Sequence, residues 1–305
     1  MSLLAIDIET YSDVDLTKCG VYAYTDSPQF EILLFAYAFD EEPTTVVDIA
    51  CGETLPQRVL DALEDTSVIK TAFNAQFERT CISKYLGHHL CPEGWQCTAV
   101  QSALLALPLS LDSVGEVLDI QRKKLKEGAD LLRFFSMPCK PTKVNGGRTR
   151  NLPEHEPEKW QRFKAYCIRD VDAEREIRWK LRNYPIPETE MELYRMDQEI
   201  NDRGILVDRQ LVANAVLCDN QYRDMVTARA YELTGLSNPN SPVQIKSWLA
   251  EHGVEAESLD KKSVKNLMAE TDGEVLEVLK LRLLMAKTSV KKYLSLIHIS
   301  EPTRH

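Results

Sequence analysis

Several features that would assign the sequence to a specialised class of protein are missing from it. No run of eighteen apolar residues occurs, so we expect no membrane-spanning helix. No glycine-rich phosphate-binding loop, internal repeat or low-complexity tract is present. The eight cysteines are scattered and form no C-x-x-C pair, which is typical of reduced thiols in a cytosolic protein. With no signal peptide at its start, the sequence predicts a globular cytoplasmic protein.

The sequence also lacks an excess of positive charge. Its formal net charge of −10 argues against non-specific wrapping of nucleic acid. Residues 121–150 depart from this balance, with nine basic and two acidic residues and a local net charge of +7. Two glycines and three prolines within 138–153 indicate a flexible loop, which is either a solvated basic face or a phosphate-binding element. The candidate phosphate contacts are Lys140, Lys143, Arg148 and Arg150.

The first half of the sequence alternates between expected strands and expected helices. Strand-like runs occur at 3–10, 30–39, 44–49 and 68–73, and helix-like runs at 56–63, 74–86, 98–107, 113–118 and 158–181. The turn at 40–43 predicts a hairpin between the second and third runs. This order predicts an α/β or α+β domain around a central sheet.

The second half of the sequence predicts helices only. A Tyr-Pro-Ile-Pro segment at 184–187 breaks the chain, and we place a domain boundary there, between 1–184 and 185–293. Helix signals follow at 188–202 and at Ser241, which with Pro242 and Gln244 forms a capping box. Between them, apolar residues three and four apart predict one buried helix face. These residues are Leu211, Ala215, Cys218, Tyr222 and Met225.

Two acids interrupt the first expected strand. Asp7 and Glu9 are two residues apart, so on a strand their side chains project from the same face. Two buried like charges repel and are costly to desolvate, and a cation between them relieves that cost. Oxygen ligands favour a hard divalent cation, above all Mg²⁺. The alternative is a strand end that reaches solvent with two hydrated carboxylates.

Three further residues are candidates for the same chemistry. Glu78 follows a short buried strand, and its alternative role is an exposed ion pair with Arg79 or Lys84. Tyr166 and Asp170 are four apart and share one face of the long helix. Their alternatives are a core tyrosine and an acid paired with Arg169 or Arg175.

Taken in order, these residues resemble the three exonuclease motifs of the DEDD superfamily, in its tyrosine-bearing subclass. The motifs here are Asp7-Ile8-Glu9, Asn74-Ala75-Gln76-Phe77-Glu78 and Tyr166-Cys167-Ile168-Arg169-Asp170. The resemblance covers residues 1 to about 182. It implies an RNase H-like fold, a mixed sheet flanked by helices, and a 3′–5′ exonuclease that releases nucleoside 5′-monophosphates.

The resemblance also implies a role for each residue. Asp7 would bridge two Mg²⁺ ions, with Mn²⁺ as a substitute, while Glu9 and Asp170 hold the ion that activates water. Tyr166 would orient that water, and Glu78 would serve the second ion through water. Thr10, Asn74 and Phe77 would contact the terminal nucleotide. The family usually has Asp where this chain has Glu78, and a carboxylate shifted by about 1 Å can cost ~100-fold in rate.

The second half resembles the start of the polymerase portion of family A DNA polymerases, in phage-type members. Asp197–Asp208 is similar to that family's entry helix and turn, and Leu233–Gly235 with Asn238–Pro242 to a Leu-Thr-Gly and Asn-x-Asn-Ser-Pro segment. Leu279–Arg282 with Lys287 resembles its thumb helix. The resemblance implies a thumb that grips primer–template duplex and an exonuclease site that takes a single-stranded 3′ end. It implies a monomer, encoded by a phage or a bacterium, that proofreads during DNA replication.

Other interpretations remain open. The chain could be a free-standing exonuclease acting on RNA or DNA, or a DNA-binding module whose site has decayed through Glu78. His88, His89, Cys91 and Cys97 could bind zinc, although their spacing matches no tight pattern and a surface turn is favoured.

We make a separate prediction for the last twelve residues. Residues 294–304 resemble an in-frame translation of a transposon-end sequencing adapter, and 294–305 are therefore expected to be a non-native tail. On this interpretation the chain is a fragment. The polymerase motifs of the resembled family lie beyond its thumb, so these 305 residues alone are expected not to polymerise.

Overall fold

The computed structural model describes residues 2–121, 128–287, 290 and 292 of the chain. The described chain divides into two compact units, the first ending at Gly204 and the second beginning at Ile205. Three expectations fall outside the described residues: the basic cluster within 122–127, the end of the last helix and the tail 294–305.

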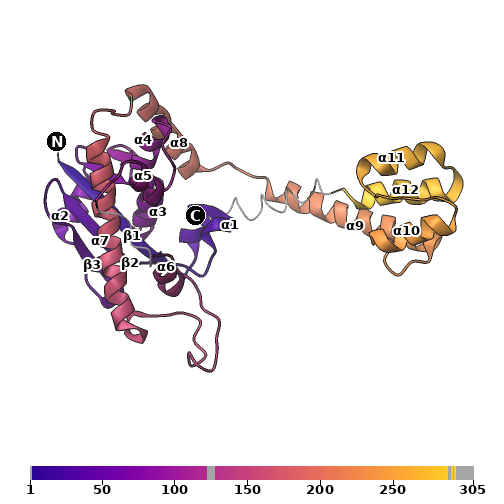
Figure 1. Ribbon diagram of the computed structural model, residues 1–305, viewed down its shortest axis with the longest axis horizontal. Helices are drawn as coiled ribbons and strands as arrows, with labels where there is room; N and C mark the ends of the chain where they lie inside the picture. The colour runs from indigo at the N-terminus through magenta and orange to yellow at the C-terminus, as the bar shows by residue number, and fades with distance from the viewer. Residues whose placement is uncertain (1, 122–127, 288–289, 291, 293–305) are drawn as a thin grey trace. The chain divides into compact units, whose positions relative to one another are not determined.

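The first unit is built on a five-stranded mixed sheet (Figure 1). Its strands are β1 (Leu3–Tyr11), β2 (Glu31–Phe39), β3 (Thr45–Asp48), β4 (Ile69–Ala72) and β5 (Trp95–Cys97). They lie in the order β3-β2-β1-β4-β5. The predicted hairpin pairs β2 with β3 antiparallel, β1 is antiparallel to β2, and β1, β4 and β5 run parallel. The predicted mixed sheet flanked by helices is confirmed.

The central strand β1 contributes side chains to two hydrophobic cores, because its side chains alternate between the two faces of the sheet. Leu4, Ile6 and Ile8 enter one core, which α2 (Gln57–Glu64) and α3 (Ala75–Leu86) cover. Ala5 and Tyr11 enter the other core, under α6 (Gly128–Phe135) and α7 (Pro157–Lys180). Asp7 and Glu9 have the same parity as Ala5, so they face α7.

The long helix α7 follows from local signals. Proline occupies its first turn, where a missing N–H costs nothing, and Arg178 and Lys180 lie in its last turn, where they complement the helix dipole. Trp160, Phe163 and Cys167 recur at spacings of three and four and are buried against the sheet. This face fixes the rotation of the helix and therefore the direction of every polar side chain on it.

The sequence did not predict five elements of the first unit. These are α1 (Leu16–Asp26), the 3₁₀ turns Ile49–Cys51 and Pro153–His155, the strand β5 and helix α6. Helix α1 contains Gly20 in a non-helical conformation with φ of 76°, which interrupts the apolar period that would have predicted it. Helices α4 (Thr98–Leu104) and α5 (Leu111–Val117) also belong to this unit.

The first unit continues beyond the proline-containing break at 184–187. Helix α8 (Glu188–Arg203) belongs to it, because Asp202 pairs with the buried Arg79 of α3 at 2.8 Å and Gln198 accepts a second hydrogen bond from the same guanidinium. The break is a change of direction within the unit, and the chain leaves it at Gly204, which has a φ of 67°. A contact between distant segments therefore moves the boundary later than local sequence signals place it.

The second unit is helical, as predicted. It comprises α9 (Arg209–Thr234), α10 (Pro242–Glu251), α11 (Lys261–Glu270) and α12 (Gly273–Met285). Ser241 caps α10 by accepting from the Gln244 N–H, and Pro242 occupies the first turn, as the capping box predicts. No helix among those described in either unit is long and apolar enough to cross a membrane.

The predicted buried face of α9 is wrong. Tyr222 and Met225 are 48% and 69% exposed, whereas Val226 and Ala230 are buried against Leu281 and Met285. The two stripes differ by a rotation of about one residue along the helix, and contacts with α12 select the second. Periodicity alone does not distinguish them, because apolar residues occupy both stripes.

Candidate metal centre

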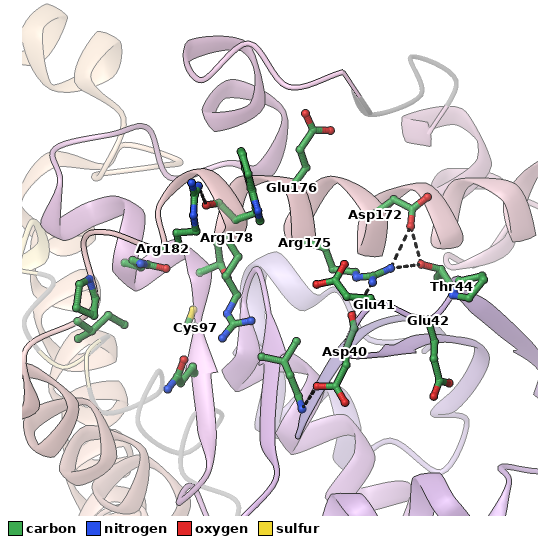
Figure 2. Close-up of a pocket in the computed structure, with 18 of the residues that line it drawn as sticks. Asp40, Glu41, Glu42, Thr44, Cys97, Asp172, Arg175, Glu176, Arg178 and Arg182 are labelled. Carbon is green, nitrogen blue, oxygen red and sulfur yellow. Dashed lines mark hydrogen bonds and ion pairs between the residues drawn. The ribbon is translucent and has the colours of Figure 1, made fainter. Parts of the chain in front are cut away.

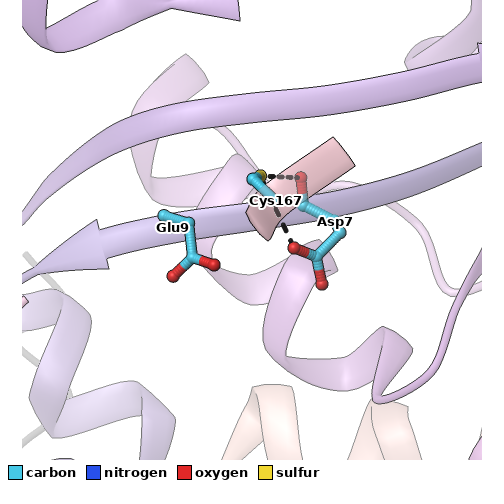
Figure 3. A group of neighbouring side chains, drawn as sticks. All are labelled: Asp7, Glu9 and Cys167. Carbon is cyan, nitrogen blue, oxygen red and sulfur yellow. Dashed lines mark hydrogen bonds between the residues drawn. The ribbon is translucent and has the colours of Figure 1, made fainter. Parts of the chain in front are cut away.

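The two acids of β1 and one thiol of α7 form a compact group (Figure 3). Asp7 and Glu9 project from the same face of the strand, as their spacing predicts, and Glu9 is 5% exposed. The Cys167 thiol donates to both the backbone oxygen and the Oδ2 of Asp7, at 3.6 and 3.5 Å. One ligand atom from each of the three residues lies within 4.8 Å of the others. The sequence places Cys167 inside the third motif but gives no sign of this contact.

Tyr166 and Asp170, which lie on α7 with Cys167, belong to the same group of side chains. Both are buried, at 1% and 4% exposure. Burial raises the pKa of the Tyr166 hydroxyl, and the carboxylates of Asp170, Glu9 and Asp7 raise it further. The hydroxyl therefore lies within electrostatic reach of three acids from two elements, and it stays protonated at neutral pH.

Glu78 approaches the same site from α3, which covers the face of the sheet opposite α7. Because β1 and β4 are parallel, their carboxyl ends share one edge, and Glu78 lies in the first turn of the helix after β4. Burial raises the pKa of its carboxyl well above the ordinary value, and the charge of Asp7 is the next cause. The expected alternative is wrong: Arg79 pairs with Asp202 and Lys84 with Asp26.

A cation fits this arrangement. Glu78 Oε2 is buried, and among the described residues it has no hydrogen-bond partner. An uncompensated buried carboxylate oxygen is costly, and a divalent cation held by neighbouring carboxylates removes that cost. All but one of the candidate ligand atoms are carboxylate oxygens, which suit Mg²⁺ or Mn²⁺.

The residues predicted to contact the substrate flank the acids. The Thr10 hydroxyl is 2.8 Å from the Tyr24 hydroxyl, and the Phe77 ring centroid is 6.2 Å from that of Tyr24. Asn74 is exposed at the start of α3, and its side chain does not cap the helix. Tyr24 was not a predicted site residue, because it lies on the unpredicted helix α1.

The basic loop is more ordered than its glycines and prolines indicate. The Asn145 side chain accepts from the Thr142 N–H at 2.8 Å and donates to the Lys140 carbonyl at 2.9 Å. Lys140 and Lys143 are exposed on this turn. Arg150 instead pairs with Glu31 at 2.5 Å and lies over the Tyr11 ring. The loop therefore presents two of its four predicted cations to solvent.

Arg148 and the histidines of the zinc hypothesis have other partners. The Arg148 Nε donates to Asn151 at 2.8 Å. His88 pairs with Glu64, and His89 with Asp202 at 2.8 Å. The side chain of each histidine thus contacts an acid outside the His-Cys segment.

The first unit also contains a hollow of its own (Figure 2). It has a volume of about 950 Å³ and lies between the β2–β3 turn, β5 and the outer face of α7. Arg175 in its wall donates to Thr44 and to the Asp40 carbonyl. None of the candidate catalytic residues lines it.

The second unit has a hollow whose charged lining residues are all basic. Its volume is about 710 Å³, and its lining combines five basic residues with apolar ones and contains no acid. The basic residues are Lys261, Lys265, Lys280, Arg282 and Lys287. Arg282 also donates to Asn240 at 2.6 Å, which ties α12 to the turn before α10.

Comparison with known proteins identifies one close relative. A DNA polymerase of Bacillus phage SP02 is 54% identical over 297 residues, which make up 97% of this chain and 46% of the phage protein. The chain thus spans about half the length of this relative. No family profile matches the chain.

Solved structures with low sequence identity also match the chain. The POL domain of Pol1 from M. smegmatis, in complex with DNA primer-template and dNTP, matches with a TM-score of 0.54 and 14% identity, over 97% of this chain and 45% of that one. Brucella melitensis NrnC with bound Mg²⁺ matches with a TM-score of 0.40 and 14% identity, over 66% of this chain and 86% of that one. By its sequence, the chain is a homologue of a phage DNA polymerase.

Proposed function

We propose that the first unit is a metal-dependent 3′–5′ exonuclease that proofreads DNA ends within a family A DNA polymerase. The observation that carries this proposal is the convergence of five residues, predicted from three separate motifs, on one buried site. These are Asp7, Glu9, Glu78, Tyr166 and Asp170. Their joint electrostatic effects on Tyr166 and Glu78 support it, because those effects require proximity.

The proposed ligands are the four carboxylates. Asp7 lies next to Glu9 on β1 and close enough to Glu78 to raise its pKa, so it is the acid that two ions would share. Glu9 and Asp170 would complete one site and Glu78 the other. Two bound divalent ions would supply an activated water and a stabilised leaving 3′-oxygen.

The proposed role of Tyr166 agrees with its raised pKa. A phenol whose pKa is raised remains neutral at pH 7 and acts as a hydrogen-bond donor rather than a base. We therefore assign it to positioning the attacking water. Gly128 packs directly on its ring, where a Cβ would lie 2.2 Å from Cε2, and so helps to fix the ring.

The proposed substrate is a DNA 3′ end. Phe77 is only partly buried where it lies beside Tyr24, so its ring is available to the terminal base, and Asn74 is exposed next to it. Lys140 and Lys143 are the proposed contacts to the phosphate backbone. Arg150 would contribute less, because Glu31 neutralises it.

For the second unit we propose binding of duplex DNA through its basic hollow. Five cations without an intervening acid suit a phosphate backbone. Such a role agrees with the thumb that the sequence resembles. The phage relative is named a DNA polymerase, and it is about twice as long as this chain. Polymerase activity of the whole protein to which this chain belongs is therefore part of the proposal.

Digestion of a 3′-mismatched primer by the purified chain tests the exonuclease. We expect stepwise release of nucleoside 5′-monophosphates in Mg²⁺ and none in EDTA. An RNA strand of the same sequence, digested in parallel, decides between a proofreading enzyme and an exonuclease of broader use. Absence of metal-dependent release from both strands would leave the decayed DNA-binding module as the better account.

A further inference from the structure

Cys167 is a neighbour of the acid cluster that the proposed hydrolysis does not use. Its side chain is fully buried, and its sulfur contacts Asp7. Buried cysteines usually act as small apolar residues. In the part of the chain that the structure describes, however, Asp7, Glu9 and Cys167 are the one group of three His, Cys, Asp or Glu side chains that come this close.

The distance between the Cys167 sulfur and the nearest Asp7 carboxylate oxygen suits a tetrahedral metal site. With Zn–S and Zn–O bonds of about 2.3 and 2.0 Å, a sulfur and an oxygen bound to one zinc ion lie about 3.5 Å apart. The Cys167 sulfur is 3.5 Å from Asp7 Oδ2. A Glu9 oxygen lies within 4.8 Å of both.

We infer that Asp7, Glu9 and Cys167 together bind one thiophilic divalent cation, Zn²⁺ or Cd²⁺. Soft thiolate ligands favour such ions, whereas Mg²⁺ gains nothing from sulfur. On binding, the S–H bond of Cys167 is replaced by a sulfur–metal bond, the proton passes to the solvent buffer, and no electron is transferred. Three protein ligands leave the fourth position for water.

The consequence of this binding rests on the proposed function. Asp7 is the acid that the two catalytic ions would share, so a soft ion held by Asp7 and Cys167 competes with them. Trace Zn²⁺ then inhibits the exonuclease. The metal binding itself stands on geometry and is measured without any activity.

Cadmium titration of the full chain tests the inference, because a cadmium–thiolate bond has its own ultraviolet charge-transfer band. The exposed thiols Cys51, Cys91 and Cys218 are first replaced by serine to lower the background. We expect a saturable band that disappears in both Cys167→Ser and Asp7→Asn. The matched control is Cys81→Ser, which alters another fully buried thiol and should keep the band.

Calorimetry with Zn²⁺ gives the second measurement. Loss of Cys167 should weaken Zn²⁺ binding by about tenfold or more, since even a supporting partner of a ligand is worth 10–100-fold in metal affinity. A band or a Zn²⁺ affinity that is the same in Cys167→Ser would overturn the inference.

Binding of Mn²⁺ separates this inference from the proposed function. Mn²⁺ relies on the oxygen ligands and should still bind to Cys167→Ser, which also shows that this variant is folded. Mn²⁺ binding without a cadmium band contradicts the soft-metal site alone. Failure of the unaltered chain to bind either ion contradicts both the site and the proposed exonuclease.

Discussion

The two units of the chain handle charge in opposite ways. The first buries negative charge, with Glu9 on β1, Glu78 on α3 and Asp170 on α7 at about 5% exposure. The second displays positive charge around a surface hollow, where Lys265 and Lys280 are examples. Buried carboxylates need cations as partners, and surface cations suit phosphates in solution. The difference is the one that the proposed roles require, with chemistry on a strand end in the first unit and binding of the strand in the second.

The largest expected effect comes from removing the acid at the centre of the first unit. Asp7→Ala should lower the rate of 3′-end hydrolysis more than ~1,000-fold, or about 4 kcal/mol, because both proposed ions share this carboxylate. Single-turnover digestion of a labelled primer measures the rate. DNA binding by the second unit should not change. A loss under tenfold would remove Asp7 from the mechanism.

The next largest effect is on the stability of the first unit against unfolding. Asp202→Ala leaves the Arg79 guanidinium buried without its partner, and we expect a loss of about 3 kcal/mol in unfolding free energy. The matched control is Glu42→Ala, which breaks an equally bidentate but exposed pair with Arg58 and should cost at most about 1 kcal/mol. Equal losses in urea denaturation would show that α8 is not held by this contact.

The same pair gives the first unit a dependence on pH. Burial raises the pKa of Asp202, but hydrogen bonds from Arg79, His89 and Tyr22 outweigh it, so the pKa is lowered overall. A lowered folded-state pKa means that the stabilisation is present above the unfolded value of about 3.9 and is lost as the pH falls through the folded value. Asp202→Ala should therefore flatten the acid side of the stability profile.

Glu78 offers a smaller effect that sharpens the account of the acid site. Glu78→Ala should slow hydrolysis by up to ~100-fold, since the second ion loses a ligand or a water-mediated contact. Glu78→Asp should keep or raise the rate, because aspartate is usual at this place in the resembled family. A rate for Glu78→Ala equal to that of the unaltered chain would return Glu78 to a structural role.

The smallest effect comes from the second unit. Lys265→Gln should weaken duplex binding and reduce its salt dependence by about one unit of slope, because one phosphate contact is lost. Lys262→Gln is the control, since Lys262 lies on the same helix but does not line the hollow. If the two variants have the same salt slope, the hollow is not the DNA contact.

The sequence predicted the features that depend on local interactions. It missed those that depend on contacts between segments far apart in the chain. Strand β1 and helix α7 follow from local periodicity, and motif order brought Asp7, Glu78 and Asp170 together as candidates. The contact of Cys167 with Asp7, the pairing of Arg79 with Asp202 and the buried face of α9 each join distant segments. Such contacts have no local signature, so only the folded chain reveals them.

Stoichiometric metal binding tests the central claim most directly. A calorimetric titration with Mn²⁺ should show two ions per chain for the unaltered protein and loss of both in Asp7→Ala, while circular dichroism confirms that the variant remains helical. Mn²⁺ binding to the unaltered chain that is no stronger than to Asp7→Ala would contradict the account, because the buried carboxylates would then not be a metal site.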